Sequence, residues 1–276
     1  MSISDLVAAA GDRLTPTDRR IASAVLEEPT LIAFGTVSDL AGRVGTSRPS
    51  VVRFAAKLGF EGYSGLQEEV RAGLSQRLSR PSQRIRQAEE ALEPLRQMVE
   101  GAIGTAFEAL AGDRLADLAR PLVDARNVWI LTGETSRAGA HALHSGLSII
   151  RPGVQLVEEH ASGRVLASAT KDDAAVVIDF ARYRRHSVTA AKLLADQGVR
   201  IVAITDDALS PLASLTDNWC ELRVPAVGPF DSSVPAVLVA ELLVARVASE
   251  LHDGALERID RTEALWEATG TFLESE

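Results

Sequence analysis

From Asn127 onward, short apolar runs alternate with segments of helical periodicity, and this alternation restricts the chain to few folds. The runs are rich in β-branched residues and lie at residues 128–131, 154–157, 174–180, 200–204 and 219–224. Continuous apolar strands that alternate with helices are typical of a parallel sheet with helices on both faces. The sequence therefore predicts a doubly wound α/β domain with a parallel five-stranded sheet.

The first 75 residues follow a different pattern, in which short helical segments are separated by glycine and proline. Thr36 or Ser38 can cap a helix that ends at Gly45. Ser47 is placed to cap the next helix, which is predicted at residues 48–58. No strand-like alternation occurs in this region, so we predict an all-α domain in front of the α/β domain.

Residues 37–58 have the size of a helix-turn-helix motif, with two helices and a turn that contains glycine. In this motif the first residues of the second helix face base edges in the major groove of DNA. Arg48 can pair with guanine or phosphate, and Thr46 and Ser47 can donate to phosphate. The predicted DNA-binding residues are Thr46, Ser47, Arg48, Ser50, Arg53 and Lys57.

The same spacing predicts which side of the second helix is buried. Val51 is expected among the base-facing residues, whereas Val52, Ala55 and Leu58 are expected to face the core. An ordinary helical hairpin with solvated arginines has the same pattern, so spacing alone leaves both interpretations open.

Charge is unevenly distributed along the chain. The formal net charge is −9, yet residues 41–86 hold nine Lys or Arg against three Asp or Glu, a balance of +6. Residues 87–276 hold 17 against 29, a balance of −12. This asymmetry is expected where one end of a chain meets a polyanion, although a solvated basic helix face gives the same balance.

A linker is predicted between the two halves. Residues 76–97 are charged and contain Pro81 and Pro94, and a helix is predicted from about Met98 to Leu118. We expect four regions in the whole chain. They are a helix-turn-helix DNA-binding domain at 1–76, a linker and connecting helix at 77–120, a ligand-binding domain at 121–251 and a C-terminal helix at 252–276.

Three segments of the N-terminal half resemble a known family. They are residues 14–22 (LTPTDRRIA), 37–41 (VSDLA) and 46–63 (TSRPSVVRFAAKLGFEGY). They resemble the N-terminal domain of RpiR-family transcriptional regulators, and the run from Ser50 to Tyr63 is a specific, contiguous match. The resemblance implies a DNA operator as partner and favours the helix-turn-helix interpretation.

Polar residues follow three of the predicted strands. Ligands of parallel α/β sheets bind beyond the carboxyl ends of the strands, near the topological switch point. Hydroxyls and free N–H groups at helix starts, with arginines beside them, suit a phosphate. Each of these hydroxyl residues, Ser136, Ser187 and Thr205, can be a plain helix cap. Because all three are predicted at the same edge of the sheet, an anion pocket is favoured. The predicted ligand residues at these strand ends are Gly133, Thr135, Ser136, Arg182, Arg184, Ser187, Thr189 and Thr205.

The second half, about residues 121–251, resembles the sugar isomerase (SIS) domain of RpiR regulators. Such domains bind phosphosugars through loops rich in serine and threonine. The resemblance places Ser136 in the first loop, Ser187 at the helix start of the second and Ser232 in a third serine-bearing segment. It therefore implies a small anionic metabolite, expected to be a sugar phosphate, whose binding alters operator binding.

Two loops depart from the family pattern. Glu134 introduces an acid that would repel phosphate, and residues 180–186 (FARYRRH) replace the usual Ser-x-Ser-Gly loop. Arg182 and Arg184 can instead bind a carboxylate or another anion, so both ligand classes stay open at this point.

A sugar-phosphate isomerase or etherase is the alternative function for a SIS fold. Isomerisation needs a base beside the reacting carbons, usually Glu or His. The candidates by residue type are Glu134, Glu158, Glu159, His160 and His186, and none has a partner spacing that marks it. His141 and His144 can share a helix face, but no third ligand accompanies them. We therefore predict no catalytic residue, no metal site, no cofactor and no enzyme activity.

Cysteine and hydropathy indicate the cellular setting. Cys220 is the single cysteine, which excludes an internal disulfide. Residues 1–15 lack the pattern of a secretory signal, and the most apolar segment, 233–248, is broken by charges. We expect a cytoplasmic protein with no membrane partner. Helix-turn-helix proteins usually bind as dimers, so a homodimer or homotetramer is expected.

Overall fold

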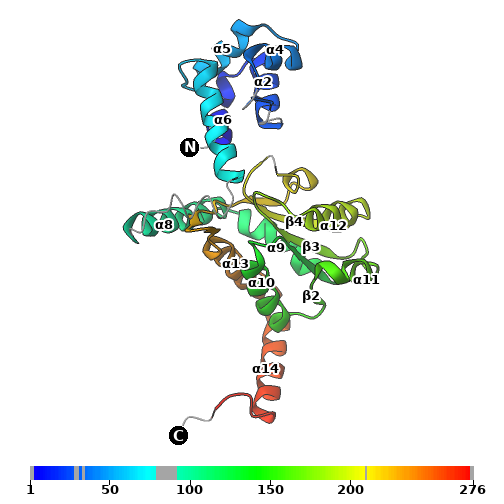
Figure 1. The fold of residues 1–276 in the computed structure, drawn as a ribbon. Helices are drawn as coiled ribbons and strands as arrows, with labels where there is room; N and C mark the ends of the chain where they lie inside the picture. Colours follow the sequence, from blue (N-terminus) through cyan, green and yellow to red (C-terminus); the bar gives the residue numbers. More distant parts are fainter. Residues whose placement is uncertain (1–2, 28–30, 33–34, 79–91, 209, 274–276) are drawn as a thin grey trace. The chain divides into compact units, whose positions relative to one another are not determined.

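The computed structural model describes residues 3–27, 31–32, 35–78, 92–208 and 210–273 (Figure 1). The chain divides after Gln83 into two compact units. The first unit is all-α, and the second contains a five-stranded sheet flanked by helices.

The N-terminal unit is a small helical domain around an aliphatic core. Its elements are α1 (Ile3–Ala10), η1 (Gly11–Arg13), α2 (Pro16–Glu27), α4 (Val37–Val44), α5 (Arg48–Lys57) and α6 (Tyr63–Leu78). Apolar side chains from these helices meet in one cluster, because each helix presents a single apolar stripe to the others. The cluster includes Ile21, Ile32, Leu40, Val51, Phe54 and Leu66.

Two similar caps fix where α2 and α4 begin. The Thr36 hydroxyl accepts from the Asp39 backbone N–H, and the Asp39 carboxylate accepts from the Thr36 backbone N–H at 2.7 Å. Thr15 and Asp18 make the same pair of bonds at the start of α2. Reciprocal bonds of this kind satisfy backbone N–H groups that a helix start leaves free. Gly45, with φ of 65°, then ends α4 and allows the turn into α5.

The buried stripe of α5 differs from the predicted one. Val51 is fully buried, whereas Val52 is 42% exposed, so the predicted roles of these two valines were wrong. Ala55 and Leu58 are buried as expected. Residues 51, 54, 55 and 58 follow the i, i+3, i+4, i+7 spacing of one helix face, whereas 52, 55 and 58 drift around the helix. Phe54, which is fully buried, sets this register.

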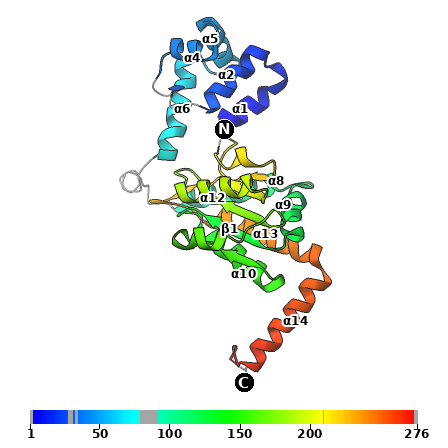
Figure 2. The same cartoon turned by 90° about the vertical axis from the view of Figure 1, so that its right-hand side faces the viewer.

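The C-terminal unit is built on five parallel strands in the order β2-β1-β3-β4-β5. The strands are β1 (Val128–Thr132), β2 (Val154–Leu156), β3 (Ala174–Ile178), β4 (Arg200–Thr205) and β5 (Trp219–Glu221). The three central strands, β1, β3 and β4, are almost entirely buried because helices cover both faces. The predicted fold class is confirmed, and the sheet lies between two helical layers (Figure 2).

Helices divide between the two faces of the sheet. One face packs against α8 (Leu92–Ala109), α9 (Arg114–Asp124), α10 (Arg137–Ile150) and α13 (Val234–Leu251). The other face packs against α11 (Ser162–Leu166) and α12 (Arg185–Asp196). The chain therefore forms one core on each side of the sheet.

The helix predicted from Met98 to Leu118 is two helices, α8 and α9, and the single-helix prediction was wrong. Gly112 lies between them with φ of 62°, a left-handed conformation that stops a helix. Pro94 lies in the first turn of α8, where proline costs no hydrogen bond, while Pro81 lies outside the described residues.

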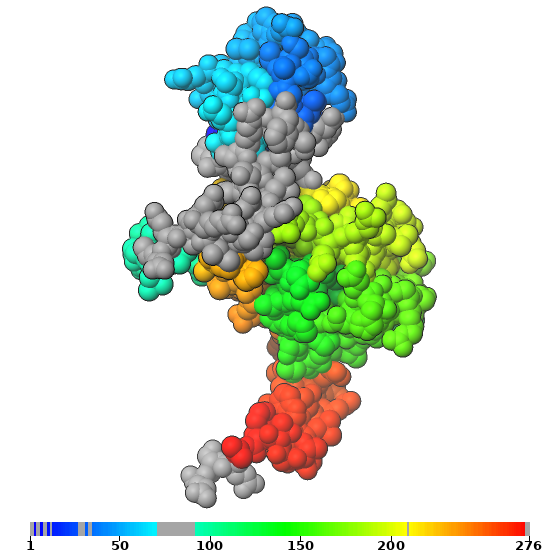
Figure 3. All heavy atoms as spheres, in the orientation of Figure 1, coloured from blue at the N-terminus to red at the C-terminus, as the bar shows by residue number. Residues whose placement is uncertain are grey.

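The end of the chain adds a small hairpin and a projecting helix. The hairpin pairs β6 (Ala226–Val227) with β7 (Phe230–Asp231). Helix α14 (Asp253–Ala268) packs its first turns near α10 and then extends away from the body of its unit (Figure 3). Within the described ranges, no helix combines the length and the apolar character needed to cross a bilayer.

Candidate functional site

The start of α5 presents a polar surface to solvent. Ser47 and Arg48 are exposed, and Ser50 is half-buried. The Ser47 and Ser50 hydroxyls lie 3.0 Å apart, and Arg53 donates to Ser50 at 3.2 Å. Ser47 is the N-cap residue of α5, as predicted, although its side chain makes no cap bond. Its hydroxyl instead joins Arg53 in one hydrogen-bonded polar patch.

Lys57, at the other end of α5, has a structural partner. Its ammonium group makes an ion pair with Asp18, a buried residue at the start of α2. Burial opposes ionisation of Asp18, but hydrogen bonds from Lys57 and Thr15 outweigh it and lower the pKa of this carboxyl. The pair therefore ties α5 to α2 through Lys57, which is exposed like Arg48 and Arg53 but has an acidic partner.

In the C-terminal unit, the sheet has its switch point at β1. The chain passes from β1 to β2 on one side of it and returns to β3 on the other. The loops after β1 and β3 therefore leave in opposite directions and open a crevice at the carboxyl edge. Gly133, Thr135 and Ser136 lie on the first of these loops and Arg182 and Arg184 on the second, whereas Ser187 and Thr189 lie in the first turns of α12.

The three serine and threonine hydroxyls predicted to bind the anion are buried. Ser136 donates to the Ile178 carbonyl at 2.5 Å, and Thr205 donates to the Ser210 hydroxyl at 2.7 Å. Ser187 donates to the Asp179 carboxylate. Ser136 is the N-cap residue of α10 but makes no side-chain cap bond, and Ser187 lies inside α12, which begins at Arg185. Each hydroxyl holds a loop to a strand end in this structure.

Asp179, which follows β3, occupies the place where an anion would meet the start of α12. Its carboxylate accepts from the backbone N–H groups of Phe180 and Arg184 and from Ser187. Burial raises the pKa of Asp179 above its ordinary value, and these hydrogen bonds oppose that rise. The N–H and hydroxyl groups at this position would suit an anion, and Asp179 supplies that negative charge from within the protein.

Gly133 makes this arrangement possible from the neighbouring loop. A Cβ atom at Gly133 would lie 1.9 Å from the Asp179 carboxylate, so the contact permits only glycine. The two residues are 46 positions apart, and local periodicity carries no sign of their contact. Sequence reasoning missed Asp179, whose only signal is a lone acid directly after a buried apolar run.

A second aspartate, Asp206 after β4, holds the same loop from its other side. It accepts from the Ala181 backbone N–H at 3.0 Å and from the Tyr183 hydroxyl. Burial, together with the Asp206 carboxylate, raises the pKa of Tyr183, so the phenol stays protonated and donates. The loop that carries Arg182 and Arg184 is thus anchored by two carboxylates.

A small pocket, the switch-point pocket, lies in the crevice. It has a volume of about 30 Å³, so a ligand larger than water requires a lining side chain to move. Glu134 makes ion pairs with Arg184 and, at 3.9 Å, with Arg137. Its pKa is lowered mainly by the Arg184 hydrogen bond. The lining residues are Thr132, Gly133, Glu134, Arg137, His141, Leu156, Val157, Glu158, Glu159, Arg184 and His186.

The remaining predicted ligand residues lie around this edge. Thr135, Arg182 and Thr189 are exposed, and Arg182 has a positive φ of 74°. Ser232 is half-buried beside the start of α13, where its hydroxyl accepts from the Val234 backbone N–H.

Helices α10 and α13 start at the same end of this unit. A Cβ atom at Gly139, in the first turn of α10, would lie 2.8 Å from that of Ala236, in the first turn of α13. Further along, Gly146 lies against Val244 in the same way. The two helices therefore run parallel, and Ser232 lies at the end of the unit that carries the switch-point pocket.

Metal-ligating side chains do not gather in the part of the chain that the structure describes. No group of three or more His, Cys, Asp or Glu residues there is placed to hold an ion. His141 lines the switch-point pocket and is exposed, while His144 is half-buried one turn further along α10.

Comparison with known proteins agrees with the two units. The sequence model "Helix-turn-helix domain, rpiR family" matches residues 1–79, and the model "SIS domain" matches residues 122–246. An HTH-type transcriptional regulator of Caldanaerobacter subterraneus is 23% identical over 90% of this chain and 91% of its own length. YfhH of Escherichia coli, also an HTH-type transcriptional regulator, is 25% identical over 91% and 94%.

Solved structures show the same fold. Vibrio vulnificus NanR, complexed with ManNAc-6P, aligns with a TM-score of 0.59 at 19% identity and covers 97% of this chain and 99% of its own. The sugar isomerase domain of an RpiR transcription factor from Sphaerobacter thermophilus aligns with a TM-score of 0.56 at 24% identity. It covers 61% of this chain and 97% of its own.

The fold and the matches define a transcriptional regulator in which a helix-turn-helix domain precedes a SIS domain. Within this class, the chain belongs to the RpiR family. The family assignment predicted from residues 14–63 is confirmed.

Proposed function

We propose that this regulator binds operator DNA through the start of α5. The observation that supports this surface is the polar patch at the start of the second helix of the motif, where Ser47, Arg48 and Arg53 are exposed and Ser50 is half-buried. Arg48 and Arg53 then meet base edges or phosphates, and Thr46 and Ser47 donate to phosphate. Lys57 takes part mainly by holding α5 in place, because Asp18 pairs with its charge.

We propose further that the SIS domain senses a small phosphorylated metabolite at the switch-point pocket. The observation that carries this proposal is the pair of arginines, Arg137 and Arg184, which face one carboxylate at the carboxyl edge of the sheet. An incoming phosphate replaces Glu134 between them, and charge-assisted bonds from arginine suit phosphate. NanR, which shares the fold, is complexed with a phosphosugar. Thr135 and Arg182 are exposed on the loops after β1 and β3 and are further polar candidates, whereas Thr189 lies in α12 outside the lining of this pocket.

Calorimetric titration of the full chain with glucose 6-phosphate, N-acetylmannosamine 6-phosphate and inorganic phosphate tests the anion site. At least one phosphate should bind, and Arg184→Gln should weaken its binding about tenfold or more because a charge-assisted bond is lost. Arg261→Gln, an exposed arginine on α14, serves as the matched control. Equal affinity in wild type and Arg184→Gln would show that the anion does not bind at this pocket.

Sugar-phosphate isomerisation is the alternative, and the placement of its candidate bases weighs against it. Glu134 is paired with Arg184, which lowers its pKa and makes it a weak base. Incubation of the full chain with aldose and ketose phosphates distinguishes the two functions. Turnover that is lost in Glu134→Gln or His186→Gln would favour an enzyme over a sensor.

A further inference from the structure

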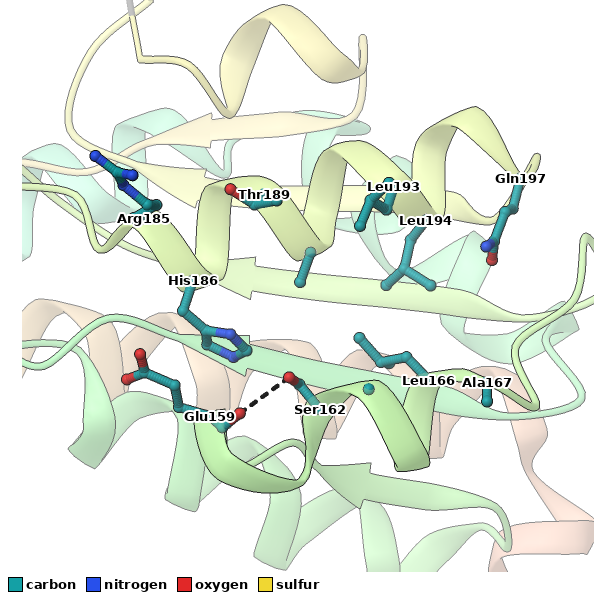
Figure 4. Close-up of a pocket in the computed structure, with 12 residues that line it drawn as sticks. Glu159, Ser162, Leu166, Ala167, Arg185, His186, Thr189, Leu193, Leu194 and Gln197 are labelled. Carbon is teal, nitrogen blue, oxygen red and sulfur yellow. Dashed lines mark hydrogen bonds between the residues drawn. The ribbon is translucent and has the colours of Figure 1, made fainter.

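A second, larger cavity adjoins the switch-point pocket between α11 and α12. Its volume is about 490 Å³, within the range of typical small-molecule sites. We call this cavity the α11–α12 groove. Figure 4 shows one wall formed by the length of α12 and the other by the segment from Glu159 to Ala167. The apolar residues that line it are Leu166, Ala167, Ala190, Leu193 and Leu194.

Leu193 is the clearest sign that the groove accepts an apolar group. Its side chain lines the cavity and is 56% exposed, while Leu194 beside it is buried in the core. Burial of exposed apolar surface by a ligand is favourable at about 25 cal/mol per Å². A hydrocarbon part that covers Leu193 and Leu166 would therefore add affinity.

The groove lies next to the switch-point pocket and shares two lining residues with it. Glu159 and His186 line both cavities, and His186 points from the first turn of α12 toward the opposite wall (Figure 4). Its Nε2 atom is buried and has no hydrogen-bond partner among the described residues. A buried polar atom of this kind is costly unless a ligand or water bonds it. One molecule can thus extend from the arginines of the switch-point pocket, past His186, into the groove.

We propose that the effector is an amphipathic phosphate ester, with its phosphate at Arg137 and Arg184 and an acyl, alkyl or aryl part in the α11–α12 groove. This inference rests on the anion site proposed above. It names the effector class more narrowly, because an unsubstituted sugar phosphate leaves the apolar walls uncovered. A small molecule is favoured over a protein partner because the groove adjoins the charged pocket and is lined by His186, whose buried nitrogen has no hydrogen-bond partner among the described residues.

Titration of the full chain with hexyl phosphate and methyl phosphate tests this inference, since the two share an acid group and differ only in hydrocarbon length. Hexyl phosphate should bind at least about tenfold more tightly, because each buried methylene adds affinity. Leu193→Glu should bring the two affinities within about twofold of each other. Leu265→Glu changes a similarly exposed leucine on α14, 61% exposed, and should leave the preference intact.

The possible outcomes separate the two proposals. Equal binding of both phosphates, weakened by Arg184→Gln, would overturn the groove inference and leave the anion site standing. Hexyl phosphate binding that Leu193→Glu weakens and Arg184→Gln does not would overturn the anion site. A preference for hexyl phosphate that survives Leu193→Glu would mean that the hexyl group binds elsewhere, and this would overturn the groove inference. If Leu193→Glu abolishes self-association instead of changing hexyl phosphate binding, the groove belongs to a second copy and the inference is wrong.

Discussion

Asp179 and Glu134 place carboxylates at the two positions where an anionic ligand would be expected to bind. Asp179 is buried and accepts from two backbone N–H groups and a hydroxyl, so a ligand cannot displace it cheaply. Glu134 is exposed and bonded to arginine side chains, which gives an exchangeable contact. At the residue scale, we therefore expect the negative group of the ligand to bind the arginines in place of Glu134. Asp179 is expected to stay bound at the start of α12.

Glu134→Gln should therefore strengthen phosphate binding. The substitution removes the carboxylate that competes for Arg137 and Arg184, and exposed ion pairs of this kind are weak. The affinity for hexyl phosphate should rise up to about fivefold, measured by calorimetry. Glu257→Gln removes an exposed ion pair with Arg261 on α14 and should change nothing. A weaker affinity in Glu134→Gln would mean that Glu134 itself contacts the ligand.

Arg48→Ala and Arg53→Ala should each weaken operator binding. Loss of a base contact from Arg48 costs about 1–3 kcal/mol, whereas loss of a phosphate contact weakens binding to all sequences and reduces its salt dependence. Gel-shift titrations against a DNA fragment selected by the full chain measure both effects. Arg120→Ala on α9 is the control, since it also removes an exposed arginine. Unchanged affinity in both variants would exclude α5 as the DNA-reading helix.

At the scale of elements, the Asp18–Lys57 pair sets the position of α5 against α2. Asp18→Asn removes the ion pair and weakens the cap of α2, and loss of a cap costs about 1 kcal/mol. Asp39→Asn alters the equivalent cap on α4, where the carboxylate is exposed. We expect the urea-unfolding free energy at pH 7 to fall more in Asp18→Asn than in Asp39→Asn. An equal loss would mean that the Lys57 pair contributes nothing beyond capping.

The contribution of Asp18 should depend on pH. The pKa of this carboxyl is lowered in the folded protein, so the folded state binds its proton less strongly than the unfolded state. The stabilisation is complete above the unfolded pKa of about 3.9 and is lost as pH falls through the lower folded value. The difference in unfolding free energy between wild type and Asp18→Asn should therefore shrink from pH 6 to pH 3. A difference that stays constant over this range would contradict the ionised role of Asp18.

The elements themselves were largely predictable, because they follow from local patterns. Apolar runs placed the five strands of the parallel sheet but not the β6–β7 hairpin, and Gly45 with the adjacent motif placed α4 and α5. The errors at the buried face of α5 and at the strand-end hydroxyls arose where packing within the folded unit decided the outcome. Phe54 fixed the register of α5 and exchanged the roles of Val51 and Val52. The buried partners of Ser136, Ser187 and Thr205 likewise come from other segments, so an exposed site could not be distinguished from a buried support by sequence.

At the scale of the whole molecule, the two units are coupled only if the effector favours one arrangement of the regulator. The expected homodimer or homotetramer stays a prediction, and so does the role of residues 77–120 as the connection. Linkage requires the effect to be reciprocal: if the effector changes operator affinity, the operator changes effector affinity by the same factor. Such coupling is typically 5–150-fold, or about 1–3 kcal/mol.

The most direct test measures operator affinity with and without saturating hexyl phosphate, in wild type and in Arg184→Gln. A DNA fragment selected from a random pool by the full chain serves as the operator, at one fixed salt concentration because phosphate contacts are salt-dependent. We predict that hexyl phosphate changes the wild-type operator Kd at least about fivefold in either direction, and that the change is lost in Arg184→Gln. An operator Kd that is identical with and without a ligand shown to bind would contradict the account, because the SIS domain would then not regulate DNA binding.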